Sequence, residues 1–337
     1  MTRSVDRRAF VGALAAVPLA GRLVRTAGRS TAQTGPDRLV IDAMGELRFE
    51  YPPELIRAMI VSGLDAITVT LCDPKPEGDE ALVLALDSLL AHDRFIAANP
   101  DLLLRGTRAD DIELARRTGR LAVFYLYQNT VQFGTDLDRI DLFHRLGLRS
   151  CQLTYNTRNH VGVGCWEEGG LTDFGRETIE RMNARRMLVD LSHANLTTMA
   201  DAIAASRAPV IISHTACMAV YQNRRNTSDA VLRALADRGG VVGICQMRPF
   251  LTPKKTDNLA AYFDHLLHAI RVAGAELKRE EGSQVQDNEL PYFIAELNGP
   301  RRMEVVWDGL VKRGLPEREV ELVMGGNVRR LYREVIG

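Results

Sequence analysis

Two apolar runs of the sequence end in the same dipeptide, Ser192-His193 and Ser213-His214. If both runs are neighbouring parallel strands, their carboxyl ends meet at one edge of the sheet and the two histidines lie side by side. Neutral imidazole is a common zinc ligand, so this pairing predicts a metal-binding site with two histidine ligands. Alternation along each strand puts the histidines on the same face as Leu191 and Ile212. We expect those apolar residues to fill a barrel interior and both imidazoles to point into its mouth. The alternative is that local hydrogen bonds satisfy each histidine.

The strands that would carry these residues alternate with segments of helical period. Short apolar runs covered on both faces are typical of parallel strands. Repeated alternation predicts an α/β fold. A glycine-rich dinucleotide turn is missing after the first run, where Asp42–Glu46 contains one glycine, so we favour a TIM-like (β/α)8 barrel over a doubly wound sheet. The predicted strands are Leu39–Met44, Ala66–Leu71, Leu121–Tyr127, Ser150–Tyr155, Leu188–His193, Val210–Thr215 and Val241–Met247.

That count gives seven strands, one fewer than a closed barrel of this type needs. The eighth should follow the helix predicted over Leu259–Ala273, but Glu276–Leu290 is charged and has Val285 as its one β-branched residue. We therefore predict that strand 8 is missing or degenerate, unless residues 274–290 contribute a strand.

The N-terminus has the layout of an export signal. Arg3, Arg7 and Arg8 precede an almost uncharged run over Ala9–Gly21, and the paired arginines resemble a twin-arginine signal. We expect residues 1–35 to be a signal peptide and linker, residues 36–337 to form one barrel domain, and the mature protein to be exported to the periplasm. The alternative is a disordered basic start on a cytoplasmic protein.

Composition excludes several classes of function. Lys plus Arg and Asp plus Glu number 43 each, which leaves no basic excess for nucleic acid. No apolar run is long enough to predict a membrane span. The five cysteines form no CxxC pair, so a thiolate zinc site has no support and buried free thiols are the simpler interpretation.

An ordered set of segments resembles the membrane (renal) dipeptidase family, peptidase family M19. The set runs from about Leu39 to the C-terminus. The resemblance implies a barrel of the metal-dependent hydrolase type that hydrolyses dipeptides or related small amides with a water held between two zinc ions. A homodimer is a reasonable expectation for such a barrel. The matching segments are Gln152–Gly164, Leu188–His193, Ile211–Thr215, Arg224–Asp229, Gly239–Gly243 and Gly325–Asn327 before Arg330-Leu331.

Part of the family's site is retained in this sequence. His193 and His214 match its two histidine metal ligands on strands 5 and 6. Arg225 matches the arginine that binds the substrate carboxylate, a task that suits a guanidinium fork. Asn156 is assigned to substrate binding with it.

Other positions depart from the family pattern. The His-x-Asp ligand pair of the first strand reads Met44 and Glu46, of which Glu46 could still bind a metal. The bridging glutamate reads Gln128, which lacks the negative charge that holds two cations together. The histidine that assists the tetrahedral intermediate reads Tyr155, whose phenol can still donate a hydrogen bond. The last aspartate falls where strand 8 is missing.

These changes leave three hypotheses open. The first is an altered metallohydrolase with His193, His214, Glu46 and Gln128 as the candidate metal residues, which favours one zinc ion over two and predicts little dipeptidase activity. The second is a non-catalytic pseudoenzyme, with or without zinc, that binds a small carboxylate ligand. The third is a damaged gene product whose open barrel exposes strand edges and melts without cooperativity.

Overall fold

The computed structural model describes residues 38–254, 258–273 and 293–337. The expected signal segment, residues 1–35, lies outside these residues. Residues 274–290, which we considered as a source of strand 8, also lie outside them.

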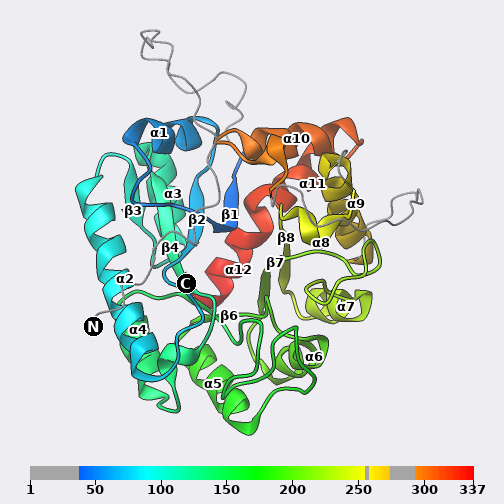
Figure 1. Ribbon diagram of the computed structural model, residues 1–337. Coiled ribbons are helices and arrows are strands. Elements are labelled where there is room, and N and C mark those ends of the chain that lie inside the picture. Colours follow the sequence, from blue (N-terminus) through cyan, green and yellow to red (C-terminus); the bar gives the residue numbers. More distant parts are fainter. Residues whose placement is uncertain (1–37, 255–257, 274–292) are drawn as a thin grey trace, which may run out of the picture.

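Parallel strands form one curved sheet, with helices around its outside (Figure 1). Each of the seven predicted strands is confirmed, with ends within a few residues of those expected. An eighth strand, β3, was not predicted. The strands are β1 (Ile41–Gly45), β2 (Ala66–Thr70), β3 (Leu103–Arg105), β4 (Leu121–Tyr127), β5 (Ser150–Gln152), β6 (Leu188–Asp190), β7 (Ile211–Thr215) and β8 (Val241–Ile244).

The extra strand does not complete the barrel. The sheet runs β1-β2-β4-β5-β6-β7-β8, and β3 pairs only with the start of β4, on the side where β5 pairs with its end. The wall of the barrel is therefore built from seven strands. Within the described ranges no strand pairs with the outer edges of β1 and β8, so the TIM-like barrel has an unsealed seam there.

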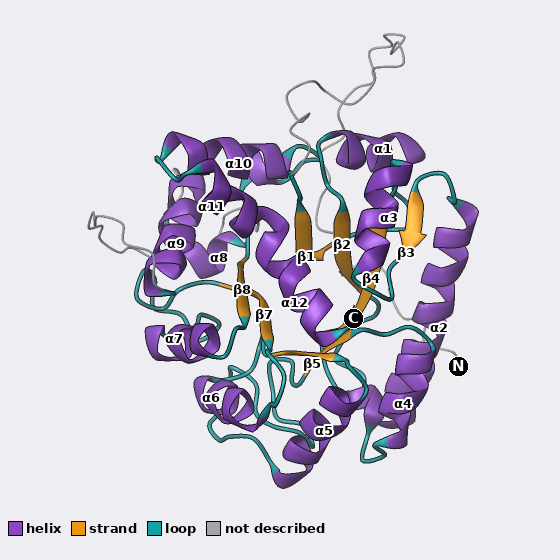
Figure 2. Ribbon diagram, turned by 180° about the vertical axis from the view of Figure 1, so that it is seen from behind, coloured by secondary structure: helices purple, strands orange, loops and turns teal. Residues whose placement is uncertain are grey.

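Most helices pack on the outside of the sheet between successive strands (Figure 2). Side chains cap the first turns of two helices, since Asn195 accepts from the Thr198 amide and Ser228 from the Val231 amide. Among the described helices, none is both long and apolar enough to span a bilayer. The helices are α1 (Pro53–Val61), α2 (Gly78–Ala98), α3 (Asp110–Thr118), α4 (Asp138–Arg145), α5 (Asp173–Ala184), α6 (Leu196–Ala205), α7 (Asp229–Asp237), α8 (Arg248–Leu251), α9 (Asn258–Val272), α10 (Arg302–Lys312), α11 (Glu317–Glu321) and α12 (Asn327–Val335), with shorter helical turns at η2 (Val131–Phe133), η3 (Ala295–Leu297) and η4 (Leu322–Gly326).

Alternate residues of most strands belong to two separate apolar layers. The outer layer joins Val189, Leu191 and Ile212 to the surrounding helices. The inner layer joins Leu188 and Ile211 to α12. The apolar residues on the histidine side of β6 and β7 therefore face outward, which contradicts our expectation that they fill the interior.

The floor of the barrel is closed by α12, which lies across the ring of strands in both views (Figures 1 and 2). Its Tyr332 hydroxyl lies 2.5 Å from Thr68 Oγ1 on β2. The Tyr332 ring also meets the edge of Phe124 on β4 at 4.9 Å between ring centroids. One helix thus contacts the interior face of the neighbouring strands β2 and β4.

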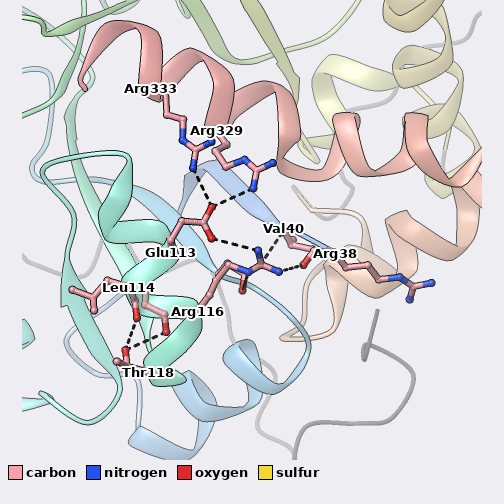
Figure 3. Close-up of polar contacts among 10 residues, drawn as sticks. Arg38, Val40, Glu113, Leu114, Arg116, Thr118, Arg329 and Arg333 are labelled. Carbon is pink, nitrogen blue, oxygen red and sulfur yellow. Dashed lines mark hydrogen bonds and ion pairs between the residues drawn. The ribbon is translucent and has the colours of Figure 1, made fainter. Parts of the chain in front are cut away.

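An ion-pair network on the outside holds α12 in place (Figure 3). The Glu113 carboxylate on α3 lies 3.2 Å from Arg329 and 3.5 Å from Arg333, both on α12. Its other oxygen lies 3.6 Å from Arg116, whose guanidinium donates to the Arg38 carbonyl ahead of β1. The network ties α3, α12 and the entry to β1 together.

The seam edge of β1 is covered by η4. Val40 accepts from the amides of Asp65 and Ala66, so the Leu39 carbonyl and the Ile41 amide face the opposite side, toward the seam. Gly325 packs there so closely that a Cβ would lie 2.6 Å from the Leu39 oxygen and 3.1 Å from the Ile41 nitrogen. Only glycine allows this approach, and it shields the edge that the damaged-product hypothesis expected to be exposed.

Candidate metal and carboxylate site

Most of the candidate residues come from the carboxyl ends of β4 to β7 and the loops that follow them. Gln128 comes directly after β4, and Tyr155 and Asn156 lie in the loop after β5. His193 lies in the loop after β6, and His214 is the fourth residue of β7. Arg225 lies in the loop between β7 and α7. Sites of this barrel fold occupy the same end.

The two imidazoles meet, as predicted, but not for the reason given. The Nε2 atoms of His193 and His214 lie 3.0 Å apart. Simple alternation would turn both rings outward with the outer apolar layer. His193 instead has a left-handed backbone, with φ of 69°, and the register between β7 and β8 shifts between Ile212 and Thr215. These two irregularities bring the rings together.

Each imidazole contacts a different polar group through its other nitrogen. His193 Nδ1 lies 2.7 Å from Asn156 Oδ1, and His214 Nδ1 lies 2.9 Å from Ser213 Oγ. Asn156, which we assigned to substrate binding, thus lies in position to orient His193. Gly164 permits this loop geometry, since a Cβ there would lie 2.2 Å from the Tyr155 carbonyl oxygen.

Burial keeps both histidines neutral. Their side chains are almost fully enclosed, and desolvation holds the pKa of each imidazole well below its usual range. The nearby Arg225 charge lowers both pKa values further. A neutral imidazole offers a nitrogen lone pair, which is the form that binds metals.

Arg225 supplies a buried positive charge beside the histidines. It is 2% exposed, and its Nη2 donates to the His214 carbonyl at 2.9 Å. Its Nε and Nη1 atoms have no hydrogen-bond partner among the residues that the structure describes. Phe250 of α8 lies over the guanidinium at 5.7 Å from the ring centroid. These two N–H groups of the guanidinium are thus left for an anionic ligand such as a carboxylate.

Tyr155 and Gln128 border the same pair of histidines. The Tyr155 ring stacks on His193, with centroids 4.2 Å apart. Burial raises the pKa of the Tyr155 phenol, although the Arg225 charge opposes this, so the hydroxyl keeps its proton and can donate it in a hydrogen bond. Gln128 Nε2 lies 3.3 Å from His214 Nε2, and rotating the amide by 180° would present an oxygen there instead.

Glu46 does not join this group in the structure. Its carboxylate pairs with Arg48, 2.6 Å away, and its side chain is about half exposed. Across the described residues, no three His, Cys, Asp or Glu side chains come together to form a group that could hold a metal ion. The three-ligand arrangement with Glu46 is therefore not formed, because the carboxylate is turned to its own neighbour in the loop after β1.

The histidine pair fits one metal ion. Two nitrogens bound to one tetrahedral zinc, each at about 2.0–2.1 Å, lie about 3.3 Å apart, close to the observed separation. A second ion would need bridging and terminal carboxylates, and the charge that Gln128 replaces is missing. The spacing of the two nitrogens is therefore compatible with one bound ion.

Sequence reasoning missed a polar group beneath the histidines. Asp190 is fully buried, and its carboxylate accepts from the amides of Ser192 and Ser213 and from the Ser213 hydroxyl, 2.5 Å away. Desolvation raises the pKa of Asp190, and the hydrogen bonds from Ser213 and Ser192 oppose that rise. The sequence does contain a signal for this polar group, because polar residues occupy alternate positions in the two apolar runs that end at His193 and His214.

A family model for membrane dipeptidases, peptidase family M19, matches residues 56–336. This chain belongs to that family. It is also 30% identical to rat "Dipeptidase 3" over 267 residues, which are 76% of this chain and 53% of that protein. The chain thus spans about half the length of this curated relative.

Two solved structures share the fold. A Pseudomonas aeruginosa amidohydrolase is 28% identical, with a TM-score of 0.79 over 89% of this chain and 97% of that one. A Rhodobacter sphaeroides metallopeptidase, described with a bound phosphinate mimic of the dipeptide L-Ala-D-Ala, is 18% identical, with a TM-score of 0.76 over 88% and 99% of the two chains. The second likeness is one of fold alone.

Proposed function

We propose that this member of the dipeptidase family is a hydrolase of dipeptides or similar small amides that uses one zinc ion. The observation that carries the proposal is the convergence of two neutral imidazoles, 3.0 Å apart, beside an arginine with two unpaired donors. Hydrolysis of a dipeptide requires a metal site at the scissile bond and, beside it, a group that binds the C-terminal carboxylate.

Each side chain has a separate task in this proposal. His193 and His214 hold the ion, and Gln128 can add its amide oxygen. When bound, zinc supplies Lewis-acid polarisation and a more acidic water. Arg225 binds the substrate carboxylate, and the protonated Tyr155 hydroxyl donates to the oxygen of the scissile carbonyl as charge develops on it. With one ion in place of two, we expect slow turnover.

The direct test combines metal stoichiometry with hydrolysis. Metal-free protein, prepared with a chelator, is titrated with zinc and then assayed with L-Ala-D-Ala and L-Ala-L-Ala. We expect one zinc per chain, slow release of alanine, and loss of both in His214→Ala. His160→Ala, at an exposed histidine, is the matched control. Failure of the unmodified protein to bind zinc would refute the proposal.

The alternative, a pseudoenzyme that binds a small carboxylate ligand, is favoured by one specific observation. The described residues contain no complete group of three metal ligands, whereas the Arg225 donors remain in place. This alternative predicts saturable dipeptide binding that survives chelation and is lost in Arg225→Ala, with no turnover at any zinc concentration.

We further propose export through the twin-arginine signal in residues 1–35, on the basis of Arg7, Arg8 and the apolar run that follows. Fractionation of cells expressing the full chain, beside an Arg7→Lys/Arg8→Lys variant, tests it. Periplasmic protein in the first and retention in the second is the expected result.

A further inference from the structure

The hydrogen bonds around the two histidines determine which nitrogen of each ring carries the proton. An ionised Asp190 accepts hydrogen bonds and cannot donate them. Ser213 Oγ lies 2.5 Å from Asp190 Oδ2, so the one hydroxyl proton of Ser213 points to the carboxylate. Two backbone amides and Gln152 Nε2 also point at this carboxylate, which favours its anionic form.

The direction of the Ser213 hydroxyl proton determines the role of Ser213 in its contact with His214. With its proton committed to Asp190, Ser213 Oγ can only accept from His214 Nδ1, 2.9 Å away. Ser192 Oγ accepts the His214 amide, and its own proton points to the second lone pair of Ser213 Oγ at 3.1 Å. Each hydroxyl proton in this chain is then donated once, and His214 carries its proton on Nδ1.

His193 is also protonated on Nδ1, because of its contact with a different residue. Its Nδ1 lies 2.7 Å from Asn156 Oδ1, an acceptor. Both Nε2 atoms are then unprotonated, and their lone pairs converge at 3.0 Å. Two facing lone pairs repel each other unless a cation lies between them, whereas a proton on either Nε2 would give an ordinary hydrogen bond and block the ion.

We propose that Asp190 is a positioning residue that acts through Ser213 to keep His214 protonated on Nδ1, and so keeps the Nε2 pair open for a cation. This rests on the proposed metal site but concerns a carboxylate that does not touch the ion. Orienting groups of this kind change metal affinity by about 10–100-fold.

The decisive variant is Asp190→Asn. An asparagine can keep its oxygen on the two backbone amides, but its amide nitrogen then donates to Ser213 Oγ. The hydroxyl proton turns to His214 Nδ1, and the His214 proton moves to Nε2. Asp65→Asn is the matched control, since Asp65 is also a buried aspartate that accepts a backbone amide, in this case from Val40.

The measurement is ¹⁵N NMR of the histidine rings in metal-free protein, which distinguishes the two tautomers directly. Seven histidines give few signals, and His214→Gln identifies the one from His214. We expect Nδ1–H for His193 and His214 in the unmodified protein and in Asp65→Asn. We expect Nε2–H for His214 in Asp190→Asn, with zinc affinity reduced at least about tenfold.

The outcomes separate this inference from the proposed function. An Nε2–H His214 in the unmodified protein, or an unchanged tautomer in Asp190→Asn, overturns the positioning role even if zinc binds. The expected tautomers in a protein that binds no zinc support the positioning role and refute the zinc enzyme. If Asp190→Asn does not fold, Ser213→Ala replaces it, and His214 that stays entirely Nδ1–H in that variant overturns the inference.

Discussion

The burial of His265 makes the free energy of unfolding depend on pH. This residue of α9 is fully buried, and its Nδ1 accepts from the Cys217 amide while its Nε2 donates to the Leu251 carbonyl. It therefore joins α9 to α8 and to the loop that carries Arg225. Burial lowers the pKa of His265 from 6.5 to about 4, with a further lowering from His268.

The sign and size of the effect follow from that pKa. Between pH 6.5 and 4 the unfolded chain protonates this histidine and the folded chain does not. The free energy of unfolding therefore falls as the pH drops through this window. The change from 6.5 to about 4 corresponds to about 3 kcal/mol lost, all of it present above pH 6.5.

The perturbation is His265→Gln, which places an acceptor and a donor near the two ring nitrogens but does not titrate. Urea unfolding followed by circular dichroism is repeated from pH 7 to 4. The variant should lose about 3 kcal/mol less than the unmodified protein over this range, whatever its stability at pH 7. The buried His193 and His214 add acid sensitivity to both proteins, so only the difference is interpreted.

His160→Gln, at an exposed histidine, is the control and should leave the pH dependence unchanged. If His265→Gln and the unmodified protein lose stability in parallel down to pH 4, the reasoning about the buried contact to Cys217 is refuted.

Three further substitutions probe the barrel floor and seam. Tyr332→Phe removes the buried hydroxyl that meets Thr68 and should cost about 1–2 kcal/mol in urea unfolding, whereas a neutral result would mean that water replaces the contact. Gly325→Ala forces a Cβ against the Leu39 carbonyl and should lower the unfolding free energy by about 1–3 kcal/mol; a stabilised variant would contradict the close approach. Glu113→Gln weakens the partly exposed arginine network on α12 and should cost about 1 kcal/mol at low salt and less at high salt. A loss that does not depend on salt would argue against an ionic origin.

The strands and their order were predictable because each main strand is a short apolar run between helical segments. β3 was not, since Leu103–Arg105 has only three residues and pairs with just the start of β4. Whether residues 274–290 contribute a strand remains a prediction, since they lie outside the described residues. The missing closure between β8 and β1 in the described chain agrees with the expected lack of strand 8.

The site was harder to predict than the fold because its geometry depends on local departures from regular structure. Strand alternation could not show that His193 adopts a left-handed backbone or that the β7–β8 register shifts between Ile212 and Thr215. Glu46 could not be excluded from the sequence, since its pairing with Arg48 depends on the path of the loop after β1. Asp190 went unassigned because the sequence does not show that its face of β6 points inward.

The position of α12 sets the order in which this barrel can be completed during synthesis. Tyr332 meets Thr68 across 264 residues, so the floor contact on β2 must wait until almost the whole described chain has left the ribosome. Until then the inner faces of the early strands are not packed against α12. Chaperones can bind these exposed apolar faces, and the strands can pair incorrectly. We expect folding to be slow and dominated by this late docking step, which links the rate of maturation to the last helix and not to the strands that form the wall.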